Sequence, residues 1–183
     1  MATLTLRPTS GTGNSWSNVA NIYDGNQSTS GSVSVSRLNY TNRTLVLNFD
    51  TSVIPSGATI NSATLTIRSQ AGKTTITAYV DINQNSANRV IDSKQSTSAV
   101  NYTADVTSYM SDLTSVDVAV NNNNWSSNTF DLYELWIDVD YTEPTAPTNT
   151  LNIKLGSTTI NNIYLGTTKV TKVYIGSTLV FKN

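Results

Sequence analysis

The side chains best suited to catalytic chemistry in this sequence are its carboxylates, because the chain contains no His and no Cys. The two absences exclude the commonest general base, cysteine nucleophiles, disulfides and zinc ribbons. Glu134 and Asp138 could act as acid and base, but on one strand they would lie about 13 Å apart, too far to flank one bond. No phosphate-binding glycine loop and no nucleophile-elbow motif occurs. The sequence therefore predicts a protein that is not an enzyme and needs no cofactor.

Metal binding is the other use of these carboxylates. Asp138 and Asp140 are spaced i and i+2, so they point to the same side of a strand and could bind calcium with Asp131 or a loop carbonyl. The oxygen series of an EF-hand loop is absent, and Asp24-Gly25-Asn26 is equally typical of an ordinary turn. We expect no metal site, and calcium stays open as the alternative.

Two tryptophans lie in runs of amide and hydroxyl side chains. Trp16 falls within Ser10–Asn18, and Trp125 follows Asn123 and Asn124. An aromatic ring beside amides is typical of sugar-binding surfaces, because the ring stacks on the apolar face of a sugar. The alternative is that each Trp fills the edge of the fold while the Asn residues form turns. These two tryptophans, with Asn123 and Asn124, are the candidate glycan-binding residues.

The elements that position these residues are predicted to be strands. Ser, Thr and Asn make up roughly 40% of the chain, and these residues favour strands and turns over helices. The longest alternation of apolar and polar residues is Asp131–Tyr141. Its apolar face is expected to carry Tyr133, Leu135, Ile137, Val139 and Tyr141, and its opposite face Leu132, Glu134, Trp136, Asp138 and Asp140.

Shorter alternations predict further strands in the first 140 residues or so. The alternation slips by one residue at Asn61-Ser62, which indicates a bulge or a tight turn. One short helical turn is expected near Val106–Leu113. About eight strands without long helices favour an all-β, antiparallel, jelly-roll-like sandwich. The other strands are expected around Leu4 and Leu6 and in Ser32–Arg37, Arg43–Asp50, Ala58–Ile67, Thr75–Ile82, Ala99–Val106 and Val116–Val120.

A linker is predicted at residues 142–150, where two prolines stand among small polar residues. Charge changes sign across it. Residues 1–143 carry seven Lys/Arg against twelve Asp/Glu, a net of −5, whereas residues 151–183 carry four Lys and no acid, a net of +4. We therefore predict a sandwich domain in 1–141 and a separate domain in 151–183.

Residues 153–182 consist of three ten-residue repeats, which begin at Ile153, Ile163 and Val173. Each reads aliphatic, Lys or Tyr, aliphatic, Gly, Ser or Thr, and then Thr. A Gly at this fixed place matches the first central position of a two-residue hairpin turn, which needs a positive φ. Each repeat is therefore predicted to form strand, turn and strand, and the set a small meander or β-prism-like domain.

This repeat domain is too small to be stable alone. About 33 residues cannot bury enough apolar surface to offset an ordering entropy of roughly 1–2 kcal/mol per residue. We expect other copies around a symmetry axis, a trimer being favoured, or a larger partner to cover it, with packing against the sandwich as the alternative. The residues predicted to make this contact are Ile153, Leu155, Ile163, Tyr164, Leu165, Lys169, Lys172, Val173, Tyr174 and Ile175.

Two parts of the chain resemble known modules. Phe49–Arg68, with Tyr102–Tyr109 and Ile137–Tyr141, resembles jelly-roll modules akin to carbohydrate-binding domains, which recur in bacteriophage structural proteins and secreted bacterial proteins. The repeats resemble short repeats at the ends of phage virion proteins. Together they imply a virion component, such as a capsid decoration protein, a head fibre or a tail-associated protein, assembled in the host cytoplasm. Neither resemblance identifies a ligand residue.

The partners implied are other virion proteins, namely the major capsid protein or a tail protein. A surface polysaccharide is the alternative, if the sandwich is a receptor-binding or tail-fibre module. Attachment through the repeats is favoured over attachment through the sandwich, because their apolar faces need a cover. The four repeat lysines form too weak a basic patch to predict nucleic-acid binding. No apolar run predicts a membrane span, and the first residues do not resemble a signal peptide.

Overall fold

The computed structural model describes residues 1–36 and 44–144, and the strands among residues 154–155, 158–159, 163–165, 168–170, 172–175 and 178–182. The chain divides into two compact units, Met1–Pro144 and Thr145–Asn183. The predicted linker spans this division, and its positions 145–150 lie outside the described residues. Each unit is considered by itself below.

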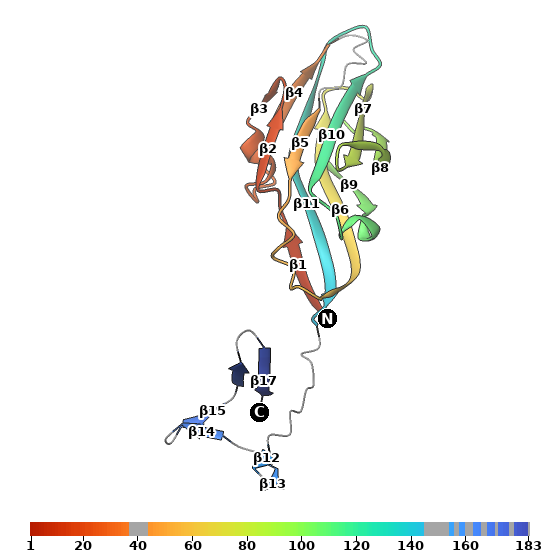
Figure 1. Cartoon of the computed structure of the whole chain (residues 1–183). Helices are drawn as coiled ribbons and strands as arrows, with labels where there is room; N and C mark the ends of the chain where they lie inside the picture. The colour runs from red at the N-terminus through yellow and green to blue at the C-terminus, as the bar shows by residue number, and fades with distance from the viewer. Residues whose placement is uncertain are drawn as a thin grey trace. The chain divides into compact units, whose positions relative to one another are not determined.

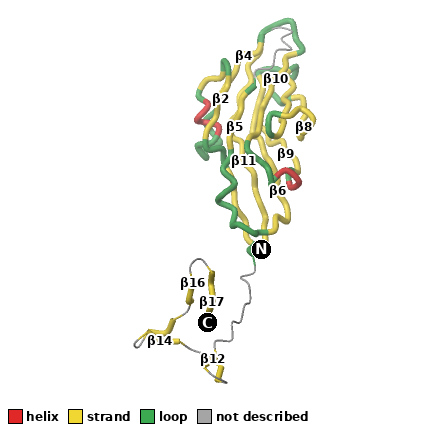
Figure 2. The backbone as a smooth tube through the Cα atoms, viewed as in Figure 1, coloured by secondary structure: helices red, strands yellow, loops and turns green. Residues whose placement is uncertain are grey.

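The first unit is built almost entirely of strands, as Figure 1 shows. The helical elements among its described residues are two short 3₁₀ turns, η1 (Val19–Ile22) and η2 (Thr107–Tyr109), drawn red in Figure 2. In the part of the chain with assigned structure, no helix has the length and apolar character to cross a bilayer. The strands are β1 (Ala2–Leu6), β2 (Ser10–Gly13), β3 (Trp16–Ser17), β4 (Gly31–Val35), β5 (Leu45–Asn48), β6 (Thr59–Ala71), β7 (Ile76–Ile82), β8 (Asn85–Lys94), β9 (Val100–Asp105), β10 (Ser115–Asn122) and β11 (Asn128–Thr142).

These strands form a sandwich of two antiparallel sheets. The first sheet has the order β3-β4-β11-β6-β9, with β1 also paired to β11, and the second has the order β2-β5-β10-β7-β8. The eight strands from β4 to β11 therefore follow the connectivity of a jelly roll, because β4, β11, β6 and β9 face β5, β10, β7 and β8. The predicted all-β, jelly-roll-like fold is confirmed.

The core lies between the two sheets and is filled by alternate residues of the strands. Leu45 and Leu47 of β5 are fully buried, as are Leu65 and Ile67 of β6. Intervening residues point outward, so the period-2 pattern of the sequence matches the two faces of each sheet. The helical turn expected near Val106–Leu113 is confirmed as η2.

Two bulges in the pairing of β11 with β6 decide which residues face outward. One leaves Asn61 without a partner, which confirms the bulge predicted from the slip in apolar phase. The other falls at Tyr133, between the pairs of Leu132 and Glu134. The expected face of Leu132 was wrong, because this second bulge turns its side chain into the core, where it is fully buried.

The described strands of the second unit form three β-hairpins, one for each predicted repeat, and the third begins one residue early, at Lys172. They are β12 (Lys154–Leu155) with β13 (Thr158–Thr159), β14 (Ile163–Leu165) with β15 (Thr168–Val170), and β16 (Lys172–Ile175) with β17 (Thr178–Lys182). An aliphatic residue pairs with a Thr three positions later at the closed end of each: Leu155 with Thr158, Leu165 with Thr168 and Ile175 with Thr178.

The predicted order of strand, turn and strand is thus confirmed for the strands, while the Gly-containing turns lie outside the described residues. The expected meander differs from the structure in one respect. The described strands form three separate two-stranded sheets, and pairing does not continue from one hairpin to the next.

Candidate functional site

The loop between β10 and β11 carries the most exposed aromatic side chain of the described residues. Trp125 lies at its tip with 67% of its surface exposed. Asn124 Oδ1 accepts the Trp125 backbone N–H at 2.6 Å, so this amide shapes the loop. Asn123 is exposed, and its backbone N–H donates to the Thr75 carbonyl at 3.2 Å. The structure therefore brings Trp125, Asn123 and Asn124 together, as the sequence indicated.

Buried asparagines hold both ends of this loop. The side-chain amide of Asn122, which is fully buried, donates to the carbonyl of Ser126 at 2.9 Å and to that of Val35 at 3.2 Å. At the other end, the Asn128 amide donates to the Lys73 carbonyl at 3.2 Å. Because buried, satisfied amides fix a backbone in place, the Trp125 ring is presented from an anchored loop.

A shallow hollow of about 220 Å³ adjoins the loop. Its lining consists of hydroxyl and amide side chains from β4, from the loop and from the start of β11: Ser34, Ser127, Asn128 and Thr129. Such groups both donate and accept hydrogen bonds, which is the chemistry that hydroxyl-rich ligands require. A loop with an exposed ring that adjoins such a hollow has the composition of a saccharide-binding surface.

The position of the loop in the sandwich follows from β11. This strand starts three residues after Trp125 and continues to Thr142, two residues before the first unit ends at Pro144. Fifteen residues of strand span roughly 45–50 Å at about 3.3 Å per residue. The Trp125 loop and the exit of the chain toward the second unit therefore lie at opposite ends of the sandwich.

Trp16 does not belong to this site. It lies in β3 with 9% of its surface exposed and packs edge-on against Phe130, with ring centroids 5.9 Å apart. Its place in the candidate glycan-binding set is corrected, because a ring buried between the sheets offers no face to a sugar. The alternative interpretation, that Trp16 fills the edge of the sandwich, describes what the structure shows.

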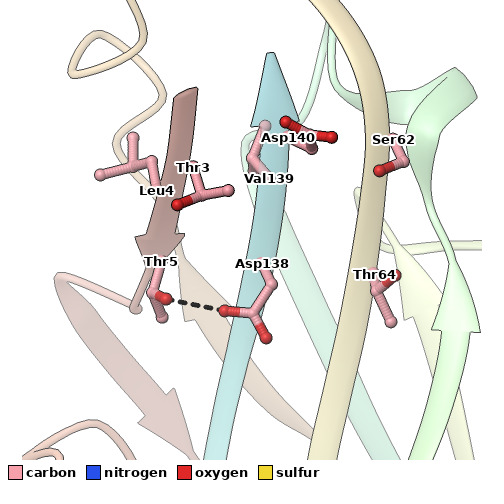
Figure 3. A pocket seen from close by; sticks show the side chains of 8 residues that line it. All are labelled: Thr3, Leu4, Thr5, Ser62, Thr64, Asp138, Val139 and Asp140. Carbon is pink, nitrogen blue, oxygen red and sulfur yellow. Dashed lines mark hydrogen bonds between the residues drawn. The ribbon is translucent and has the colours of Figure 1, made fainter. Parts of the chain in front are cut away.

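The outer face of the first sheet carries the acidic row predicted on β11. Figure 3 shows the hollow that it forms with β1 and β6, which has a volume of about 370 Å³. The Thr5 hydroxyl donates to Asp138 Oδ1 at 2.7 Å, and the Trp136 indole N–H donates to Asp138 Oδ2 at 2.8 Å. Both oxygens of Asp138 are therefore engaged. Asp140 lies farther along the strand, opposite Ser62 in register.

The calcium alternative gains no support from this geometry. Because both oxygens of Asp138 accept hydrogen bonds, Asp140 is the main carboxylate left as a ligand on this face. Within the described residues, no group of three carboxylates lies close enough together to hold a metal ion. Asp131 pairs with Gln70 in register, at the other end of β11 from Asp140. Burial raises the pKa of Asp131.

Glu134 is fully buried although it lies on the outer face of the sheet. Its Oε1 accepts a hydrogen bond from Arg7 Nε of the segment after β1 at 2.8 Å. Glu134 and Asp138 are separated by four residues of strand, as the sequence indicated, and do not form a catalytic pair. The carboxylate of Glu134 instead ties the start of the chain to β11.

Sequence reasoning missed one cluster, on the outer face of the second sheet. Asp81 of β7 and Asp117 of β10 pair directly in register, and Arg89 of β8 pairs with Asp81. Asp117 is far from Asp81 and Arg89 in the sequence, and β8, which carries Arg89, has no regular apolar alternation. Only the strand order reveals that they meet, and the cluster is taken up again below.

The residues predicted to mediate association lie in the second unit. Leu155, Ile163, Tyr164, Leu165, Lys169, Lys172, Val173, Tyr174 and Ile175 are in described strands, and Ile153 lies outside the described residues. Lys172 is exposed; the side chains of the others are not among those described.

Comparisons with known proteins leave the family open. No family model matches the sequence, and no curated protein matches it significantly. Solved structures with a similar fold include a crystal structure with a xylogluco-oligosaccharide (12% identity, TM-score 0.43), a CBM4 structure (14%, 0.40) and a family two carbohydrate esterase from Cellvibrio japonicus (11%, 0.35). These matches cover 75%, 75% and 79% of this chain, but 36%, 94% and 36% of the other chains. Similarity at this level establishes neither a common family nor a common function.

Proposed function

We propose that this protein is a non-enzymatic structural protein that associates through its C-terminal hairpins and displays the β-sandwich. One observation carries the proposal: the described strands of the second unit form three separate two-stranded sheets. An isolated two-stranded hairpin is at best marginally stable in water. Hairpins that do not continue into one another need further strands or apolar surface from outside, and further copies of the same chain arranged around an axis can supply both.

The distribution of charge also supports association through the hairpins and display of the sandwich. The first 143 residues have a net charge of −5, and residues 151–183 have a net charge of +4. A basic hairpin unit is attracted to an acidic surface, whether that of a neighbouring copy or of a larger particle. The resemblance of the repeats to those of phage virion proteins makes a bacteriophage particle our proposed setting, with this chain as a capsid decoration protein or head fibre.

The test uses equivalent positions of the three repeats. Leu155, Leu165 and Ile175, each the residue next to the closed end of its hairpin, are replaced together by Ser in the full chain. We expect sedimentation velocity to show an assembly for the unchanged chain and a monomer for this variant. Replacing Asn161 and Thr171 by Ser, at a variable position of the repeat, serves as the control and should leave the assembly intact. Assembly of the triple variant would refute the proposal.

The phage setting has its own test. Labelled full chain and a chain ending at Pro144 are added to purified particles of the phage whose genome encodes the sequence, after deletion of that gene. We expect the full chain to bind the particles and the shortened chain to remain in solution. Binding of the shortened chain would place attachment in the sandwich, and binding of neither would remove the virion role.

A second function, glycan binding for host attachment, is favoured by the exposed Trp125 ring. The ring lies 67% exposed at the end of the sandwich farthest from Pro144, and its loop adjoins a hollow lined by hydroxyl and amide groups. We expect Trp125→Ala to abolish binding of the full chain to purified host surface polysaccharide without lowering the Tm. Asn14→Ala, at an exposed position in another loop, is the control. Unchanged binding by Trp125→Ala would exclude this role for the loop.

A further inference from the structure

The second sheet brings two carboxylates face to face on its outer surface. Asp81 of β7 and Asp117 of β10 are direct partners in the antiparallel register. Their neighbours Val80, Ile82 and Val118 point into the core, so both aspartates point the other way. Like charges directly opposite one another destabilise a sheet, and a pair that persists needs compensation or a purpose.

Arg89 compensates only one of the two. Its Nε donates to Asp81 Oδ1 at 2.8 Å and its Nη2 to Asp81 Oδ2 at 3.2 Å, so both oxygens of Asp81 are used. The guanidinium also lies over the Tyr79 ring, 4.3 Å from its centroid. A bidentate pair held on an aromatic face is fixed in orientation. The Arg89–Asp81 ion pair is therefore held in one orientation, unlike a mobile ion pair at the surface.

Asp117 remains incompletely satisfied. It is 4% exposed, and its Oδ2 accepts the backbone N–H of Gln84 in the turn between β7 and β8. Its Oδ1 is buried and has no hydrogen-bond partner among the described residues. Burial raises the pKa of this carboxyl, an effect that the Gln84 N–H and the nearby Ser115 hydroxyl oppose. A buried acceptor without a partner is costly, and proteins retain such groups mainly where a ligand or ordered water completes them.

The unpaired oxygen belongs to the lining of a groove. The groove has a volume of about 300 Å³, at the lower end of the range for small-ligand sites. Ala119 lies two residues after Asp117 on the same face of β10, and its small side chain leaves space at the bottom of the groove. The described residues that line it are Thr44, Asp81, Gln84, Ser86, Arg89, Asp117 and Ala119.

The chemistry of the lining selects the class of ligand. A second cation is disfavoured, because Arg89 stands in the groove and already occupies both oxygens of Asp81. An anion is disfavoured by the Asp117 carboxylate. A hydroxyl group fits, because it donates to a carboxylate and at the same time accepts from an amide or a guanidinium. Several adjacent hydroxyls would be needed to use the Ser86, Thr44 and Gln84 side chains as well.

We propose that this groove binds a hydroxyl-rich ligand of the saccharide class, with one ligand hydroxyl donating to Asp117 Oδ1 and the Arg89–Asp81 pair orienting its neighbours. The site lies near the start of β10, whereas the Trp125 loop follows the end of that strand. It does not depend on association through the hairpins or on binding at Trp125. If the groove binds no ligand, the proposals for the hairpins and for the Trp125 loop are unaffected. If either of those proposals fails, the proposal for the groove is unaffected.

The test is an NMR titration of the full chain, labelled with ¹⁵N, with cellobiose, maltose, lactose and N,N′-diacetylchitobiose. Each sugar is raised to about 50 mM, which reveals a Kd in the millimolar range. We expect at least one sugar to shift the backbone amides of Gln84 and Ala119 saturably. Asp117→Asn should raise the Kd for that sugar about tenfold, which is the loss expected for one hydrogen bond to a charged acceptor.

Three further variants separate the groove from other causes. Ala119→Met fills the floor without removing a polar group and should also weaken binding. Asp112→Asn, an exposed aspartate with the same change of charge, and Trp125→Ala should leave the Kd unchanged. The proposal is overturned if no sugar shifts these amides, if binding survives both Asp117→Asn and Ala119→Met, or if calcium chloride alone shifts the same amides saturably.

Discussion

Replacing Asp117 by Asn should stabilise the sandwich at neutral pH. Asp117 is 4% exposed, its Oδ1 lacks a partner within the described residues, and Asp81 lies opposite on β7. Asn keeps an oxygen for the Gln84 N–H, while it removes a buried charge that lies opposite the like charge of Asp81. We expect a gain of about 1 kcal/mol in the free energy of unfolding, or about 3 °C in Tm for a unit of this size.

The pH dependence gives this gain a specific signature. Burial raises the pKa of Asp117 and the neighbouring charge of Asp81 adds to the rise, while the Gln84 N–H and the nearby Ser115 hydroxyl oppose it. A group with a raised folded-state pKa binds its proton more tightly when folded. Stability is therefore lost as pH rises from the unfolded-state pKa of about 3.9 through the folded-state value. The variant escapes this loss, so its advantage should be absent below about pH 3 and complete at neutral pH.

Urea denaturation of the full chain, followed by tryptophan fluorescence at several pH values, measures the effect. Asp112→Asn provides the control, because it removes the same charge from an exposed position and should change stability little. A variant at Asp117 that is less stable at neutral pH, or whose advantage is the same at low and neutral pH, would refute the reasoning. The carboxylate would then be a satisfied structural group.

Other substitutions probe the core. Trp16→Ala should lower the free energy of unfolding, measured by urea denaturation, by about 3–5 kcal/mol, because the ring is buried against Phe130. Trp125→Ala should change it by less than about 0.5 kcal/mol, because that ring is exposed. Equal losses in the two variants would contradict the assignment of one ring to the core and the other to the surface. Gly31→Ala should cost about 1–3 kcal/mol, since a Cβ there would lie 2.5 Å from Cδ1 of the fully buried Ile22. A Gly31→Ala chain as stable as the unchanged one would show that Ile22 has room to move.

Much of the fold was predictable because alternation and burial coincide. Leu45 and Leu47, and Leu65 and Ile67, are apolar residues two positions apart, and each pair faces the core. The bulge at Asn61 was visible as a slip in phase. The bulge at Tyr133 was not, because Leu132 and Tyr133 are both large and apolar, and either could face inward.

Elements without apolar alternation escaped prediction. Strands β2, β3 and β8 are polar or very short, and they lie at the edges of the two sheets, where one side needs no partner. The candidate loop was predictable because its Trp and Asn residues are contiguous. The Asp81–Asp117 cluster was not, because it exists only through the pairing of β7 with β10.

The molar mass of the chain in solution, measured by light scattering after size exclusion, tests the claim that the hairpins cause association. We predict an assembly for the full chain, about 59 kDa if three copies of 19.8 kDa combine, and a monomer for a chain ending at Pro144. The account would be contradicted if both proteins had the same number of chains per particle, either because both are monomers or because both form the same assembly.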